Sequence, residues 1–331
     1  NRDLRFYGKA ITLKSRNGPK NCILDCQGTL EDPHRGFRLY ELQDAKDPVI
    51  EGLTIQHGMA GEDFLKQLPP LEGGGIYIYE IKPTIRRCIF QNNRASESGG
   101  AVFSIAGGKD EDLHNPVTIE GCIFSDNYAA AQGGGLAMID RIVLQNSLLF
   151  ENKASNGGAV YGWGSFQSLI NCTLSRNEAV RGGGIFLEDS LENPALNNQD
   201  FRMNLVNSIV WENYAVFGSE IFLNQANPYG YPPVIWISHS DVRGGADEIA
   251  VETEGYFLWE KSNLMKDPLF KAPEIGDYHL TAGSPCIDAA DSTYALPFDL
   301  ERIMRFDDPD TPNSGTGLIK YVDIGAFEYK P

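Results

Sequence analysis

The sequence predicts an all-β solenoid, a parallel β-helix, because one short unit recurs along most of the chain and its apolar residues alternate as in half-buried strands. The unit is clearest in residues 117–135, around Cys122. The equivalent positions in the other copies are Leu53, Cys88, Ser147, Cys172, Ser208 and Ser240. Successive copies are 25 to 36 residues apart, which is too short for two helices and a strand but leaves room for loops in the longer copies.

Each copy is expected to fold into three short strands separated by turns. The position before the Cys122 column is occupied by Gly52, Arg87, Gly121, Asn146, Asn171, Asn207 and His239. Glycine and asparagine tolerate a left-handed backbone, so this column predicts a sharp bend between the first and second strands. Glycine pairs precede a third strand, whose expected inward residues are Val102, Leu136, Val160, Ile185 and Ile221. We therefore predict about nine coils, stacked roughly 4.8 Å apart like neighbouring strands of a sheet.

A column of asparagines lies five positions after the Cys122 column. It contains Asn93, Asn127, Asn152, Asn177 and Asn213. Stacked identical amides can hydrogen-bond to one another and to the turn backbone, as in the asparagine ladders of cross-β assemblies. We interpret this column as a structural ladder rather than as a catalytic feature.

The cysteines are interpreted as small core residues rather than as a disulfide framework. Cys88, Cys122 and Cys172 share a column that holds serine in other copies, and free cysteine packs like a small hydrophobic residue. Cys22 and Cys26 are four residues apart, which is about 13 Å along an extended strand and too far for a disulfide bond.

Composition excludes several classes of function. A net charge of −17 argues against nucleic acid as a partner and against attraction of anionic polysaccharides by bulk charge. No run of eighteen apolar residues is present, so no membrane-spanning helix is predicted. Strand-like sequence begins at Leu4, so we expect that a leader, or an earlier coil with its cap, precedes Asn1 in the full-length protein.

Two repeated motifs resemble those of a known bacterial family. Phe90-Gln-Asn-Asn93 and Gly99-Gly-Ala-Val102 are similar to the Phe-x-x-Asn and Gly-Gly-Ala-Ile/Leu/Val repeats of the chlamydial polymorphic outer-membrane proteins. They also resemble the wider class of bacterial right-handed parallel β-helix proteins with a pectin-lyase-like fold. The resemblance covers about residues 50–245. It implies a right-handed helix and an exported bacterial protein, extracellular or at the cell surface. It implies no single activity, because that class includes lyases, hydrolases, epimerases, adhesins and autotransporter passengers.

The C-terminal part of the chain departs from the repeat, which divides the protein into a β-helix over residues 1–262 and a separate segment over 263–331. Asp267-Pro-Leu-Phe270, the stretch 277–288 and Val322-Asp-Ile-Gly-Ala-Phe-Glu328 resemble the C-terminal segment of bacterial choice-of-anchor Q surface proteins. The stretch 299–305 departs from that family's usual turn sequence. We expect the apolar residues of the segment to form a C-terminal cap that closes the open end of the solenoid, as repeat proteins require.

The catalytic candidates are Glu51, Arg86 and Glu120, on the outer face of the first strand in successive coils. Two coil spacings place the carboxylates about 10 Å apart, which is marginally compatible with an inverting glycosidase. Arg86 is the candidate base for a polysaccharide lyase. An ion ladder on a solvated face explains the same three residues without chemistry.

Outward positions become apolar further along the chain, at Val143, Ile170, Val206 and Trp236. Two explanations remain open. The insertions 188–203 and 224–234 fold over these residues, or the residues form a surface for a glycan or protein partner. In the second case the candidate stacking groups are Trp211, Tyr229, Tyr231 and Trp236.

A candidate calcium site is formed by Asp307, Asp308 and Asp310, because hard cations bind several oxygens on a turn. Their spacing differs from that of an EF-hand loop, and Asp-Pro turns are common without metal. The default expectation is therefore that no cofactor is bound.

These features favour an exported protein that acts by binding or scaffolding, as an adhesin, a passenger module or a surface-assembly component. The expected partners are a carbohydrate, a surface protein or further copies of the chain. The alternative is a polysaccharide lyase or glycoside hydrolase acting on the outer face of the first sheet.

Overall fold

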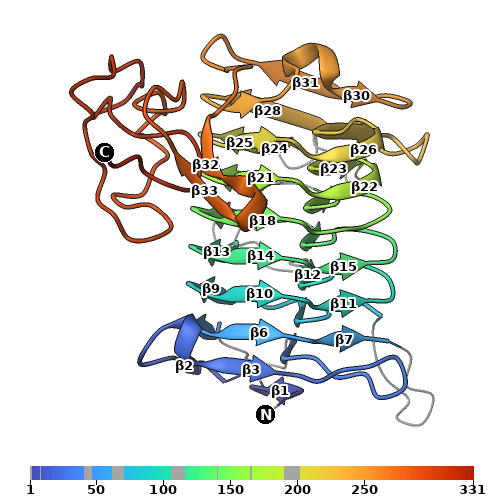
Figure 1. The fold of residues 1–331 in the computed structure, drawn as a ribbon. Helices are drawn as coiled ribbons and strands as arrows, with labels where there is room; N and C mark the ends of the chain where they lie inside the picture. The colour runs from blue at the N-terminus through green and yellow to red at the C-terminus, as the bar shows by residue number, and fades with distance from the viewer. Residues whose placement is uncertain are drawn as a thin grey trace.

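The computed structural model describes residues 2–7, 9–40, 47–61, 71–105, 116–139, 141–164, 166–189 and 202–331, with only the backbone described at residue 202. These residues fold into a right-handed parallel β-helix, as predicted, and they contain no α-helix. It follows that none of the described helical turns is long and apolar enough to cross a membrane. Figure 1 shows the coils stacked from the N-terminal end towards β31, with the C-terminal segment beside them.

Three parallel sheets run along the solenoid, and each coil contributes a strand to them. The first sheet contains β2 (Thr12–Lys14), β5 (Val49–Glu51), β9 (Thr84–Arg86), β13 (Val117–Glu120), β17 (Ile142–Gln145), β20 (Gln167–Ile170), β24 (Arg202–Val206), β28 (Val234–Ser238) and β31 (Tyr256–Trp259). The second sheet contains β3 (Ile23–Asp25), β6 (Thr54–Gln56), β10 (Ile89–Gln91), β14 (Ile123–Ser125), β18 (Leu148–Phe150), β21 (Thr173–Ser175), β25 (Ile209–Trp211) and β29 (Asp241–Val242). The third sheet contains β1 (Leu4–Arg5), β4 (Phe37–Tyr40), β8 (Ile76–Tyr79), β12 (Val102–Ile105), β16 (Leu136–Ile139), β19 (Val160–Trp163), β23 (Ile185–Glu188), β27 (Ile221–Asn224) and β30 (Ala250–Val251).

The bend between the first and second sheets lies where it was predicted. All seven residues of that column have positive φ, from 46° at Asn146 to 73° at Gly52. A second turn follows the second sheet, and there the left-handed residue directly precedes the ladder asparagine, as at Asp126 (φ 56°). Short strands follow this turn in several coils: β7 (Met59–Ala60), β11 (Arg94–Ala95), β15 (Tyr128–Ala129), β22 (Glu178–Arg181) and β26 (Tyr214–Phe217).

The core is a set of aligned apolar columns inside the solenoid. Ile85, Ile119 and Leu144 are direct register partners on β9, β13 and β17, and all three are fully buried. Cys88, Cys122 and Cys172, each directly after a bend residue, are also fully buried. All six cysteines of the chain are free thiols. Similar apolar residues of successive coils therefore lie on top of one another. Each coil shields the core residues of the next coil from water along the axis of the solenoid.

The C-terminal segment packs against the side of the solenoid, which corrects the expectation that it closes the open end (Figure 1). It begins with an antiparallel pair, β32 (Phe270–Ala272) and β33 (Asp277–Leu280). Its apolar residues cover β18 and β25, where Leu148 and Ile209 are 2% and 1% exposed. The outer face of the second sheet is apolar in these coils, so its burial provides the driving force for docking the segment there.

Asparagines at the bend fix the C-terminal segment to the solenoid by hydrogen bonds. The side-chain amides of Asn146, Asn171 and Asn207 donate to the carbonyls of Phe298, Asp323 and Asp291, at 2.7, 3.1 and 2.8 Å. The backbone N–H of Asp291 in turn donates to Asn207 Oδ1 at 2.8 Å. Three successive coils thus present amide groups to the segment.

Candidate functional site

The asparagine column forms one continuous row of hydrogen bonds. Each Nδ2 donates to the Oδ1 of the next asparagine at 2.8 to 3.0 Å, through Asn93, Asn127, Asn152, Asn177 and Asn213. Each accepting Oδ1 also takes the backbone N–H of the preceding asparagine. All five side chains are buried. This geometry satisfies the turn backbone and engages both ends of each amide within the row, which is a structural role.

A buried glutamate ends the row. Asn213 Nδ2 donates to Glu220 Oε2 at 2.6 Å, and Glu220 is only 4% exposed. Its second oxygen, Oε1, is buried without a hydrogen-bond partner in the described part of the chain. Burial raises the pKa of Glu220 to about 7, against the lowering effect of the hydrogen bonds from Asn213.

The first catalytic candidate, Glu51, lies at the centre of an ion cluster. The Glu51 carboxylate is 1% exposed and contacts Lys14 Nζ at 2.8 Å and Arg86 Nε at 2.7 Å. Arg87 also pairs with Glu51. Arg86 lies between Glu51 and Glu120 in the strand register, as expected. A carboxylate enclosed by three cations is poorly placed to attack or protonate a sugar, so the geometry favours an ionic role for Glu51. The arrangement differs from the expected ladder on a solvated face, because Glu51 is buried and, among the described residues, no ion pair joins Arg86 to Glu120.

Replacing the central anion is expected to destabilise the protein modestly. Glu51→Gln should lower the free energy of unfolding by about 2 kcal/mol, because three cations lose the anion that they share. The loss is smaller than for a fully buried pair, since Arg86 and Arg87 are 42% and 37% exposed. Urea unfolding measures the change, with Glu120→Gln as the control. An equal loss in both variants would contradict the cluster.

The four candidate stacking residues are not gathered on one surface. Trp211, on β25, packs against the apolar cluster of the C-terminal segment. Trp236, on β28, donates from Nε1 to Glu260 at 3.2 Å and meets the ring of Tyr294 edge-on, with 6.1 Å between ring centroids. Tyr229 is 91% exposed, in the loop after β27 that also holds the half-buried Tyr231. These residues therefore lie on different faces of the coil.

The apolar outward residues also fall into separate rows. Val143 is aligned with Ser168, whereas Ile170 is aligned with Val206 in the neighbouring row. Val206 is 1% exposed, and Tyr294 of the C-terminal segment lies against Trp236. Cover by the insertions 188–203 and 224–234 was one of the two open explanations. The ring contact to Trp236 comes from Tyr294, in the C-terminal segment. Most of the insertion 188–203 lies outside the described residues.

The three aspartates of the calcium candidate differ in their surroundings. Asp308 is buried, and its carboxylate accepts from Asp310 N–H at 3.3 Å and from Thr311 Oγ1 at 2.6 Å. Asp307 and Asp310 are exposed. Within the described ranges, no three His, Cys, Asp or Glu side chains are grouped so that they could hold a metal ion.

A groove of about 720 Å³ lies where the C-terminal segment meets the second sheet. Its floor consists of outward residues of three adjacent strands, Ile89, Ile123, Leu148 and Phe150. The opposite wall is formed by Ile275, Gly276, Asp277, His279, Leu300, Glu301 and Phe327. Pro19, Lys20, Arg87, Gln91 and Ser125 supply much of the remaining lining. An apolar floor with polar groups along its edges is the usual composition of a ligand site.

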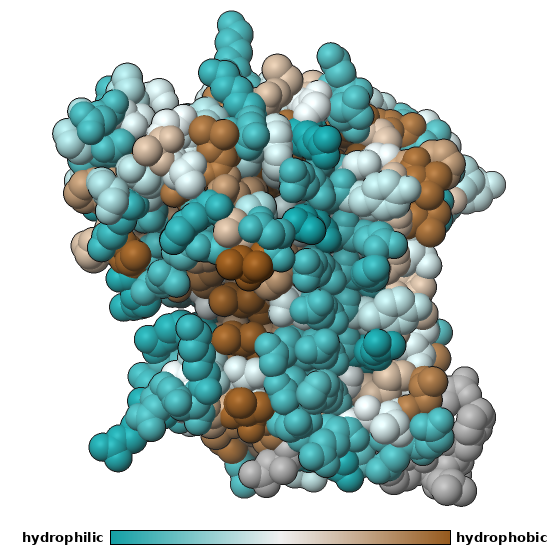
Figure 2. All heavy atoms as spheres, viewed as in Figure 1, coloured by the Kyte–Doolittle hydropathy of each residue, from teal (hydrophilic) through white to brown (hydrophobic). Residues whose placement is uncertain are grey.

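The floor of the groove belongs to an apolar column on the outer face of the second sheet. The C-terminal segment covers the part of this column that lies in the later coils. In register order this column runs through Ile23, Ile89, Ile123, Leu148 and Ile209, with threonines at two positions. Ile209 is 1% exposed, whereas Ile23 is 57% exposed. Figure 2 shows brown apolar atoms in a column over the second sheet, beside a hollow below the C-terminal segment. The groove therefore begins where the cover ends.

A histidine between two carboxylates lies on the wall of the groove. His279 Nδ1 is 2.5 Å from Asp277 Oδ1, and His279 Nε2 is 3.3 Å from Glu301 Oε2. Burial alone would raise the pKa of Asp277, but the hydrogen bonds from His279 outweigh it and hold the pKa below its usual value. The ring of His279 also packs on Phe327, with 4.3 Å between centroids. These contacts fix a polar, hydrogen-bonding side chain at the groove edge.

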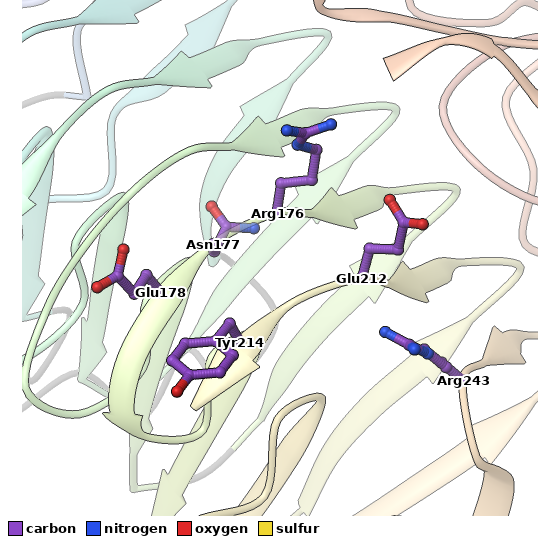
Figure 3. A pocket seen from close by; sticks show the side chains of 6 residues that line it. All are labelled: Arg176, Asn177, Glu178, Glu212, Tyr214 and Arg243. Atoms are coloured by element: carbon purple, nitrogen blue, oxygen red, sulfur yellow. The ribbon is translucent and has the colours of Figure 1, made fainter. Parts of the chain in front are cut away.

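A second hollow, of about 440 Å³, is lined mainly by charged groups. Figure 3 shows Arg176, Glu212 and Arg243 projecting from successive turns, with Glu178 and Tyr214 on the neighbouring strands. Arg176 and Glu212 occupy the left-handed position of the second turn, which directs their side chains outward. With both signs of charge and little apolar floor, this hollow is a weaker ligand site than the groove.

Two features outside the central core of the solenoid were not identified from the sequence. The groove depends on residues far apart in the chain, and no local motif indicates it. The outer face of the third sheet carries Tyr77, Phe103, Tyr161, Phe186 and Phe222, whose neighbouring rings are 5.4 to 5.8 Å apart where they stack. Each of these aromatics directly follows an inward aliphatic residue, so strand alternation applied to the third strand would have revealed this column.

Comparison with known proteins supports one repeat of the fold. Residues 87–105 match the Chlamydia polymorphic membrane protein (Chlamydia_PMP) repeat. The matched stretch contains β10, β11 and β12, so the similarity concerns one coil and not the whole chain. Comparisons with curated proteins and with solved structures each gave no significant match. The resemblance of the C-terminal segment to choice-of-anchor proteins stays an expectation.

Proposed function

We propose that this protein is a cell-surface or extracellular β-helix that binds a neutral glycan in the groove and does not cleave it. The repeat it shares with a bacterial membrane-protein family supports the location in general terms. The observation that carries the binding proposal is the groove itself, an open apolar floor along three stacked strands with polar groups on both edges.

The chemistry of the groove suits a sugar chain. Sugar rings present apolar C–H faces and hydroxyl edges, which match an aliphatic and aromatic floor flanked by Gln91, Ser125 and His279. Lys20 and Arg87 on one side are balanced by Asp277 and Glu301 on the other. The balance of local charges, together with the net charge of −17, favours a neutral glycan over an anionic polymer.

Groove variants test this proposal directly. Ile123→Asp should weaken binding of a neutral oligosaccharide at least about tenfold, because it places a charge on the apolar floor. Ile23→Asp is the matched control, since Ile23 lies in the same outward column but outside the groove. Isothermal titration calorimetry with oligosaccharides from a glycan array measures both. Equal affinity of Ile123→Asp and wild type would place the ligand elsewhere.

A glycoside hydrolase or lyase is the second candidate, because Asp277, His279 and Glu301 meet at the groove wall. In that case Glu301→Gln would abolish product release from a bound polymer while leaving the groove floor intact. We expect no product from either wild type or variant, and glycan affinity should change less than with Ile123→Asp. Reducing-sugar and unsaturated-uronate assays distinguish the two candidates.

A further inference from the structure

We propose that the last coil of the solenoid binds an extended, basic polypeptide strand, which pairs with the free edge of β31. The partner is a protein segment in which apolar residues alternate with lysine or arginine. Figure 1 shows β31 at the end of the stack, with the C-terminal segment to one side. No residue of β31 lines the groove, and this proposal does not depend on the glycan proposal.

The backbone of β31 is paired on one side only. It is the last strand of the first sheet, and within the described part of the chain no strand lies on its other side. The N–H groups of Tyr256 and Glu260 donate towards β28, to the carbonyls of Pro233 at 2.9 Å and Ile237 at 3.1 Å. Alternate residues of a strand direct their backbone groups to opposite edges, so Phe257 and Trp259 present theirs at the open end. Such an edge is a template for a further strand.

The apolar core also ends at this coil without a cover. Phe257 is the register partner of Ile235, which is fully buried, yet Phe257 itself is 37% exposed. On the third sheet, Val251 is the register partner of the fully buried Leu223 and is 40% exposed. The C-terminal segment does not supply the cover, because it packs on the outer face of the second sheet. A strand added to β31 would extend the sheet over these side chains and bury them.

The charge at this end favours a basic partner. Arg181 pairs with Glu252 at 2.9 Å and neutralises one carboxylate there. Two copies of the chain joined at this end would bring like charges together, whereas a basic strand would be attracted. Residues 247–261 carry one exposed cation, Lys261, against five exposed carboxylates, Asp247, Glu248, Glu252, Glu254 and Glu260.

The alternation of β31 specifies the alternation of its partner. In strand addition, backbone hydrogen bonds provide affinity and alternate side chains provide specificity. Inward side chains of the added strand would stack on Phe257 and Trp259, so they should be apolar. Its outward side chains would lie on the face of Tyr256 and Leu258, between the flanking carboxylates, so they should be basic.

A labelled peptide that alternates valine and lysine tests this edge on the intact protein. We expect one peptide to bind per chain by fluorescence anisotropy. The same peptide with glutamate in place of lysine should bind at least about tenfold more weakly. Hydrogen exchange should slow at the amides of Phe257 and Trp259, because the bound peptide would accept their hydrogen bonds.

Charge reversal separates this site from general attraction of a basic peptide to an acidic protein. Glu254→Lys combined with Glu260→Lys should weaken binding at least about tenfold. The matched control is Glu31→Lys combined with Glu274→Lys, which changes the net charge equally at exposed positions outside the last coil. It should weaken binding less than about twofold, because salt screens distant charges.

Phe257→Pro tests the backbone edge itself. It removes an outward N–H without removing a bond to β28, and proline is tolerated at edge positions of this kind. It should abolish peptide binding, and melting temperatures establish that each variant is folded. The proposal is overturned if the peptide does not bind wild type, if the two charge-reversed proteins bind it alike, or if the bound peptide leaves exchange in β31 unchanged. Self-association of wild type that Phe257→Pro abolishes, seen by sedimentation velocity, would also overturn it, because a second copy would then occupy the edge.

Discussion

Asn127→Ala is expected to lower the free energy of unfolding by about 4 kcal/mol, because it interrupts the asparagine ladder at an interior position. Asn127 Oδ1 accepts from both the backbone and the side chain of Asn93, and Asn127 Nδ2 donates to Asn152 and to the carbonyl of Phe90. Alanine leaves these groups buried and unpaired, and each unpaired group costs about 1–3 kcal/mol. Equilibrium denaturant unfolding measures the loss.

Asn204→Ala is the control for this variant. Asn204 lies on the outer face of β24, is partly exposed and donates one hydrogen bond of 3.3 Å to Ser168. Its removal should cost less than about 1 kcal/mol. If the two alanine variants unfold alike, the ladder does not stabilise the solenoid in the way its geometry indicates.

Glu220→Gln is expected to stabilise the protein at alkaline pH by about 3 kcal/mol. The pKa of Glu220 is raised by burial from 4.5 to about 7, so the folded protein holds a proton that the unfolded chain releases. Glutamine removes the cost of a buried charge while its carbonyl oxygen can still accept the hydrogen bond from Asn213.

The sign of the pH dependence follows from that raised pKa. The contribution of Glu220 to stability is fully present below about pH 4.5 and is lost as the pH rises through about 7. Melting temperatures of wild type and Glu220→Gln should therefore diverge between pH 5 and 8, while the exposed Glu274→Gln follows wild type. Comparing variant with wild type is essential, because burial also raises the pKa of Asp241 to about 6 and that of Asp288 to about 7. Parallel curves would show that Glu220 is ionised in the folded state throughout.

The repeating part of the molecule could be predicted because its information is local. The aligned copies repeat the same bend and the same inward alternation, and five of the seven repeat the same asparagine, so their alignment specifies which residues face the core. The left-handed column from Gly52 to His239 is the clearest example, since all seven positions have positive φ.

The placement of the C-terminal segment could not be predicted in the same way. Its apolar residues indicated that the segment must pack against another apolar surface. The open end of the solenoid and the apolar outer face of the second sheet both offer such a surface. The bend asparagines carried the missing information, because Asn146, Asn171 and Asn207 use their amides to bind this segment. From sequence they were interpreted only as residues that tolerate the bend, and the groove between the segment and the second sheet was therefore missed.

The candidate site illustrates the difference between spacing and environment. Spacing correctly placed Arg86 between Glu51 and Glu120, but it did not show that Lys14 and Arg87 also surround Glu51. Contacts between segments far apart in the sequence determine whether a carboxylate is paired with cations or is available for catalysis.

The most direct test of the central claim is to incubate the wild-type protein with a panel of polysaccharides and measure binding and product formation in the same samples. We predict that at least one neutral glycan binds, that Ile123→Asp weakens this binding at least about tenfold, and that the polymer is recovered intact. Release of shortened or unsaturated products would contradict the account and would direct attention to Asp277, His279 and Glu301. Absence of binding to every glycan would equally contradict it, and the groove would then have to be tested against protein partners.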